Sequence, residues 1–227
     1  MLKRGQVTIF VILGLVILII LGIVYYVKFY ILESKYVNIV PQDIQAVDEY
    51  VKNCLEQTVK EGLVYLGDHG GYFIEEIPYY YKNNVSLIEE NFLNRELNNY
   101  INYRLNYCIK DFYYLSEYNI QENGFEVNSE INQNVNVLLD YKLDITKADK
   151  TYNLRYFNVV LNSNISKMFD IADFIVEDYA LNGNRNCITC IYDKIEETNF
   201  DLYINYVDDG ILYSLDNGQE NFDWLIL

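Results

Sequence analysis

The chain has 227 residues, with 17 Lys and Arg against 33 Asp and Glu, so its formal net charge at pH 7 is −16. Nucleic-acid binding depends on clustered cations that neutralise phosphates, so this balance excludes nucleic acid as an expected partner. With 24 Tyr and only 2 Pro, the composition also excludes a disordered or Pro/Ser/Thr-rich stalk.

The first apolar segment predicts a transmembrane helix. Residues 6–27 carry no charge and are almost wholly apolar, which is long enough to cross a hydrocarbon core of ~30 Å. Lys3 and Arg4 precede the segment, and a positive flank stays in the cytoplasm. The sequence thus predicts a single-pass protein of the cell membrane, whose partner over residues 6–28 is the lipid bilayer. The expected organisation is a cytoplasmic basic flank at 1–5, a transmembrane helix at 6–28, a juxtamembrane connector at 29–42 and an extracellular domain at 43–227.

The residues before the apolar segment carry a family resemblance. Lys3-Arg4-Gly5-Gln6 resembles the leader of archaeal type IV pilin precursors. The resemblance implies processing between Gly5 and Gln6, with the mature chain beginning at Gln6. The family has a glutamate at the fifth mature position, used in filament assembly, and this chain departs from it with Phe10. A plain signal-anchor helix, in which the basic pair only sets orientation, is the alternative.

Three amphipathic helices are predicted beyond the connector. Apolar residues at spacings of three and four define them over residues 43–66, 87–115 and 165–181. Asp43 is the candidate N-cap of the first helix and Gly67 its C-terminal stop.

Strands follow where the apolar period changes to two. Residues 135–145 and 151–161 predict a hairpin, and 202–206, 211–215 and 222–226 predict a meander. The expected fold class is α+β, an N-terminal transmembrane helix followed by an extracellular domain of about three helices packed on antiparallel sheet.

Cys54 and Cys108 fall on the apolar stripes of the first two predicted helices. If those helices pack together, their thiols face one another, and outside the cell this geometry predicts a disulfide. Two unpaired buried cysteines are the alternative.

Cys187 and Cys190 form a Cys-x-x-Cys motif with three interpretations. The favoured interpretation is a small structural disulfide within the loop. The others are a redox-active pair, which in the thioredoxin-like arrangement opens a helix directly after a strand, and half of a zinc site. Zinc would need two further ligands, and His69 is the only histidine.

Two further motifs bear on chemistry. Asn84 and Asn164 each begin a triplet that fits the N-glycosylation rule. His69-Gly70-Gly71 resembles an oxyanion-hole element of esterases, but the chain has no Gly-x-Ser-x-Gly elbow. A helix end followed by a tight turn is the favoured interpretation. No catalytic residue, metal site or cofactor is predicted.

A second resemblance spans much of the first predicted helix. Gly5-Gln6-Val7-Thr8, Cys54, Gly70-Gly71-Tyr72 and Cys108 resemble the pattern of membrane-anchored surface proteins from small-genome archaea. It implies a surface location and a shared scaffold, and it supports pairing of Cys54 with Cys108. We therefore expect a cell-surface protein for adhesion, assembly or binding rather than an enzyme. It would be either a pilin-like subunit that self-assembles or an anchored module that binds a protein partner. The alternative is an anchored thiol-disulfide redox protein that uses Cys187 and Cys190.

Overall fold

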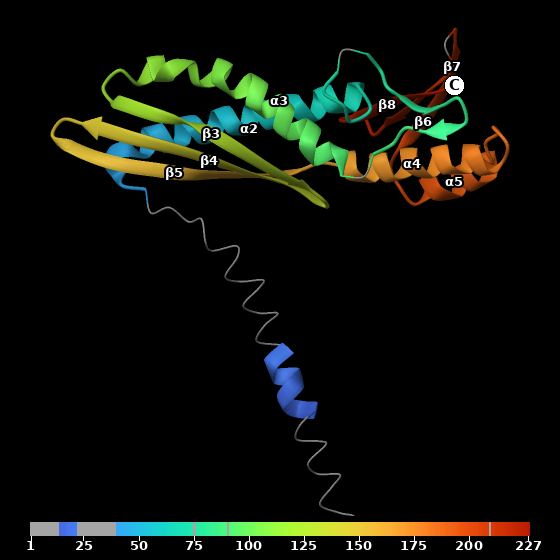
Figure 1. Cartoon of the computed structure of the whole chain (residues 1–227), viewed down its shortest axis with the longest axis horizontal. Helices are drawn as coiled ribbons and strands as arrows, with labels where there is room; N and C mark the ends of the chain where they lie inside the picture. Colours follow the sequence, from blue (N-terminus) through green and yellow to red (C-terminus); the bar gives the residue numbers. More distant parts are fainter. Residues whose placement is uncertain (1–13, 22–39, 75, 90, 209) are drawn as a thin grey trace, which may run out of the picture. The chain divides into compact units, whose positions relative to one another are not determined.

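The computed structural model describes residues 14–21, 40–74, 76–89, 91–208 and 210–227. The chain divides into two units, Met1–Ile39 and Val40–Leu227, and the fold below is that of the second (Figure 1). In the first unit, residues 14–21 are helical.

The predicted transmembrane helix requires correction. Among the described residues, none of the helices combines the length and the apolar character that crossing a membrane demands. The described part of the predicted 6–28 helix, residues 14–21, covers about 12 Å of the ~30 Å hydrocarbon core. The rest of that segment, the 1–5 flank and most of the 29–42 connector lie outside the described residues.

Two long helices form the centre of the second unit. Helix α2 spans Gln45–Asp68 after a short 3-10 turn, η1, at Gln42–Ile44. Helix α3 spans Phe92–Ile109 and continues into a second 3-10 segment, η2, at Lys110–Leu115. The centres of their apolar stripes are fully buried, as expected for amphipathic helices that share a core. The central members of these stripes are Val47, Val51, Leu55, Val59, Leu97, Ile101 and Leu105.

A three-stranded antiparallel sheet covers the helix pair on one side. Its order is β3-β4-β5, with β3 at Asn119–Ile131, β4 at Asn134–Lys147 and β5 at Lys150–Asn162. Alternate residues of β4 are buried, which is the pattern of a strand with one face on the core. Figure 1 shows the long strands of this sheet lying alongside α2 and α3.

A five-stranded sheet of order β2-β1-β8-β7-β6 lies at the other end of the unit. Its central strand β8 (Asn221–Ile226) pairs antiparallel with β7 (Gly210–Asp216) and parallel with β1 (Tyr79–Lys82). The edges are β2 (Val85–Ser86) and β6 (Asp201–Val207). Helix α4 (Ile165–Leu181) contacts β8, and α5 (Ile188–Glu196) contacts α4. The core here is aromatic, with Trp224, Tyr213, Phe222 and Tyr80 at most 1 % exposed.

Over the residues that the structure describes, the fold is α+β with two sheets. The predicted fold class is wrong in its membrane helix and in having only antiparallel sheet. The parallel pairing of β1 with β8 was not predicted. The predicted helix over 87–115 ends early, because Lys110, Asp111 and Phe112 adopt left-handed backbone angles that interrupt the helical hydrogen bonds.

Candidate functional site

The Cys54–Cys108 disulfide joins α2 to α3, with a Cα–Cα distance of 5.6 Å. Cys54 is 3 % exposed and Cys108 is half-buried. The predicted pairing of these cysteines is confirmed. The bond fixes the relative position of the two helices that carry the surface described next.

An aromatic groove opens along the α2–α3 seam, and we define it by its lining residues. It is a cavity of about 500 Å³ lined by Tyr65, Phe73, Ile74, Tyr100, Tyr103 and Arg104. The rings form a connected cluster. Phe73 has its centroid 5.7 Å from that of Tyr65, 5.5 Å from that of Tyr100 and 5.7 Å from that of Tyr103.

The loop after α2 is held in place to form one wall of the groove. The Tyr65 hydroxyl donates to the carbonyl oxygen of Ile74 at 2.7 Å. The backbone N–H of Phe73 donates to the carboxylate of Glu96 on α3 at 3.3 Å. The His69 ring stacks on Tyr65 with a centroid distance of 4.2 Å, while its Nδ1 lies 2.7 Å from the Tyr65 carbonyl oxygen. Because a carbonyl only accepts, Nδ1 carries the proton.

The base of the groove is buried and its rim is open. Tyr100 is 5 % exposed, whereas Tyr103 is 55 % exposed. Burial raises the pKa of the Tyr100 phenol, against the opposing effect of the nearby Arg104 charge. Tyr107, 60 % exposed, extends the aromatic rim, with its ring 5.9 Å from that of Tyr103 and 5.7 Å from the Arg104 guanidinium.

This combination of groups suits non-covalent recognition. Tyr presents a rigid ring with a polar tip, and Arg presents several donors in a plane, so both contribute strongly to interfaces. A smaller hollow of about 260 Å³ next to the groove shares Arg104 and continues over Tyr107, Cys108 and Lys110. The groove and this hollow thus follow the α2–α3 seam that the disulfide fixes.

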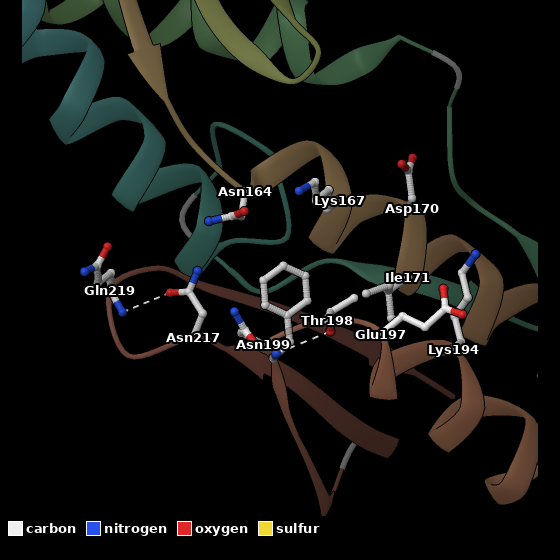
Figure 2. A pocket seen from close by; sticks show the side chains of 11 residues that line it. Asn164, Lys167, Asp170, Ile171, Lys194, Glu197, Thr198, Asn199, Asn217 and Gln219 are labelled. Atoms are coloured by element: carbon white, nitrogen blue, oxygen red, sulfur yellow. Dashed lines mark hydrogen bonds between the residues drawn. The ribbon is translucent and has the colours of Figure 1, made fainter.

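A second cavity, of about 570 Å³, is polar (Figure 2). Figure 2 shows Asn164, the N-cap of α4, and Lys167 and Asp170 on that helix above Asn217 and Gln219 from the β7–β8 turn. Phe200 and Ile171 are apolar members of its lining. The buried side-chain atoms without a hydrogen-bond partner in the described part of the chain belong to Asp48, Asn98, Asn186 and Trp224, none of which lines this cavity. It therefore presents no buried polar atom that is left for a ligand.

Cys187 and Cys190 are bonded to each other, and the motif is not confined to a loop. Cys187 is the N-cap of α5, and its sulfur accepts from the Cys190 N–H at 3.4 Å. The preceding element is helix α4 rather than a strand. A carboxylate oxygen of Asp178 and both sulfurs lie within 4.8 Å of one another. Cysteine binds zinc as a thiolate. The sulfurs of a disulfide are not thiolates, so the bonded pair does not support the zinc interpretation.

The two glycosylation candidates differ in setting. Asn84 is exposed in the turn between β1 and β2. Asn164 is half-buried at the start of α4, where its side-chain nitrogen donates to Glu220 at 3.0 Å. A glycan would be attached through that same nitrogen, so the setting favours Asn84. Both assignments stay predictions. The processing residues Gly5 and Gln6 lie outside the described residues.

His69 and the glycines after it end α2, as the helix-end interpretation expects. His69 is the C-cap of α2, and Gly70 and Gly71 both have positive φ. The Gly70 carbonyl accepts from the buried Tyr80 hydroxyl at 2.6 Å. The turn is therefore structural, because its carbonyl holds Tyr80 of β1 in position.

The aromatic groove was not predicted, although the sequence of α3 carries one signal for it. Tyr100, Tyr103 and Tyr107 stand at spacings of three and four on α3, which places them along one helix face. The loop that brings Phe73 and Ile74 to that face has no helical or strand periodicity in its sequence that would predict this position. No known protein family, curated protein or solved structure was found to match the chain.

Proposed function

We propose that the protein is an extracytoplasmic binding domain that acts in adhesion or assembly at the cell surface and binds a protein partner through the aromatic groove. The observation that carries this proposal is the ring cluster of Tyr65, Phe73, Tyr100 and Tyr103 beside Arg104. It is open to solvent and lies on the helix pair that a disulfide links.

The division of the groove into a buried base and an exposed rim supports binding by preorganisation. Tyr100 is held by packing, so it loses little freedom when a partner arrives. Tyr103 and Tyr107 have large exposed area but only two side-chain torsions each, so ordering them costs less than ordering long flexible side chains.

The charge of the chain favours a different protein as the partner over a second copy. At a net charge of −16, two copies repel each other, whereas a basic partner is attracted and a neutral partner is not repelled. A filament or other self-assembly would have to overcome that repulsion at the interface.

The cysteines support the location. Disulfides persist in oxidising compartments and are rare in the cytosol. All of the cysteines are paired in this structure, and one of the two bonds joins elements 54 residues apart.

The experiment compares two exposed tyrosines. Wild type, Tyr103→Ala and Tyr114→Ala are titrated onto isolated envelopes of the source cells, and bound protein is measured at several salt concentrations. Tyr114 is 66 % exposed on η2 and does not line the groove, so it is the matched control. The expected result is saturable binding by the wild type. Tyr103→Ala should weaken that binding roughly thirtyfold, or by about 2 kcal/mol, and Tyr114→Ala should leave it unchanged.

Sedimentation of the wild type at physiological salt is the companion measurement, and a monomer is expected. Equal binding by the two variants would contradict the groove as the site. Concentration-dependent self-assembly that Tyr103→Ala abolishes would show that the partner is a second copy and overturn the choice of partner.

A further inference from the structure

The second disulfide, Cys187–Cys190, is placed differently from the first. Cys190 is exposed and Cys187 half-buried, so an incoming group reaches Cys190 more readily. The bond closes only the short segment at the start of α5, with a sequence separation of 3. Opening it therefore releases much less chain than opening Cys54–Cys108, whose separation is 54.

The less accessible sulfur is the one that its surroundings stabilise as a thiolate. The Cys190 N–H points to the Cys187 sulfur at 3.4 Å, and the Thr189 hydroxyl lies 3.5 Å from it. Both are at the N-terminus of α5, which spans Ile188–Glu196, and the partial positive charge of a helix N-terminus favours a thiolate there. A thiol of lower pKa is the better leaving group in thiol–disulfide exchange.

A carboxylate is positioned beside the bond. Asp178 on α4 accepts from the Cys187 N–H at 2.7 Å and from the Asn182 side-chain amide at 2.7 Å. These two bonds hold it within 4.8 Å of both sulfurs. Its negative charge opposes the partial positive charge of the helix N-terminus, so it limits how far that N-terminus stabilises a thiolate on Cys187.

We propose that Cys187–Cys190 is an exchangeable disulfide that oxidises dithiols of other extracytoplasmic proteins. A thiolate of the dithiol partner attacks the Cys190 sulfur, forming a mixed disulfide. The Cys187–Cys190 bond breaks, and its electron pair leaves on Cys187. The partner's second thiolate then attacks its own sulfur in the mixed disulfide and releases Cys190. The partner loses two electrons and two protons and gains a disulfide, while Cys187 and Cys190 end as thiols. This inference does not depend on the aromatic groove.

The first experiment uses the other disulfide of the same chain as its reference. The oxidised full-length protein is equilibrated in glutathione redox buffers, quenched with an alkylating reagent and mapped by peptide mass. Cys187–Cys190 is expected to pass from oxidised to reduced across the buffers, while Cys54–Cys108 remains oxidised. A Cys187–Cys190 bond that stays oxidised throughout overturns the proposal.

The second experiment separates an exchange site from a merely exposed bond. A synthetic peptide with two cysteines is mixed with the oxidised protein, and early samples are trapped by acid. One peptide disulfide should form per protein, and the trapped mixed disulfide should be on Cys190. A peptide that stays reduced, or a mixed disulfide found mainly on Cys187, contradicts the assignment.

A pair of variants tests the leaving group. Thr189→Val keeps the side-chain shape but removes the hydroxyl near the Cys187 sulfur, and it should slow the exchange roughly threefold to tenfold. Ile188→Val changes an exposed neighbour without a polar contact to the sulfurs, and it should leave the rate unchanged. Equal rates for both variants would remove Thr189 from the mechanism and overturn the proposed direction of the leaving group.

Discussion

Gly67 in the last turn of α2 lies directly against the backbone carbonyl of Asn221 at the start of β8, so a Cβ at position 67 would collide with that oxygen. The neighbouring residues reinforce the contact, because the Asn221 side-chain amide donates to the Asp68 carboxylate at 2.7 Å. The end of α2 is thereby fixed on the five-stranded sheet. Gly67 was predicted as a helix stop, but it is helical, and its role is to let a strand approach.

Gly67→Ala should therefore destabilise the protein by about 3 kcal/mol, because neither backbone can move without disturbing the sheet. The control is Gly183→Ala, where φ is +65° but open space surrounds the added Cβ. That variant should cost only about 1 kcal/mol of backbone strain. Urea unfolding of both variants is the measurement, and equal losses would show that the approach of Asn221 is not tight.

Tyr80→Phe should lower the free energy of unfolding by about 1–2 kcal/mol. Tyr80 is 1 % exposed, and its hydroxyl donates to the Gly70 carbonyl, so its removal leaves a buried acceptor without a partner. Tyr113→Phe is the control, because Tyr113 is 78 % exposed and should be neutral. A neutral Tyr80→Phe variant would mean that water replaces the lost donor.

The Arg155–Asp140 pair predicts an acid dependence of stability. Two hydrogen bonds from Arg155, of 2.7 and 2.8 Å, hold the pKa of Asp140 below its ordinary value. A depressed carboxyl pKa contributes stability that is present above the unfolded pKa and is lost as the pH falls through the folded pKa. In Arg155→Gln, NMR titration should find the Asp140 pKa moved up toward its ordinary value.

The stability difference between wild type and Arg155→Gln should also shrink as the pH falls below about 4. The Arg155 side chain is 55 % exposed and that of Asp140 is 30 % exposed, so solvent screens the pair and the difference is small even at neutral pH. A difference that grows on acidification would contradict the assignment.

The disulfides should differ in their effect on stability. Closing the loop between Cys54 and Cys108 restricts the unfolded chain by about 4 kcal/mol, and closing the short loop between Cys187 and Cys190 by about 2 kcal/mol. Replacing each pair by alanine and measuring urea unfolding tests this order. A larger loss from the Cys187/Cys190 variant would show that the second bond is chiefly structural.

The elements predicted best are those whose pattern is local. Helix α4 has the predicted bounds, and the β4–β5 hairpin and the β6–β8 meander are confirmed, because an apolar period of 3.6 or 2 records the buried face directly. The Cys54–Cys108 pair was predictable for the same reason, since both residues lie on helical stripes.

The elements that were missed depend on contacts distant in sequence. Strand β3 has mostly exposed residues in its first half, so it shows little alternation, and its pairing with β4 determines its structure. β1 is a strand because Tyr79 and Tyr81 pair with the end of β8, a parallel contact that the local sequence does not encode. The aromatic groove forms only when α2, α3 and the loop between them are packed together, so no single segment of sequence predicts it.

Disulfide mapping of the protein taken from its own cells, with free thiols alkylated before lysis, tests the proposed extracytoplasmic role most directly. Cys54 and Cys108 should be recovered joined to each other in essentially all molecules. Recovery of both as alkylated free thiols would place the chain in a reducing compartment and contradict the account.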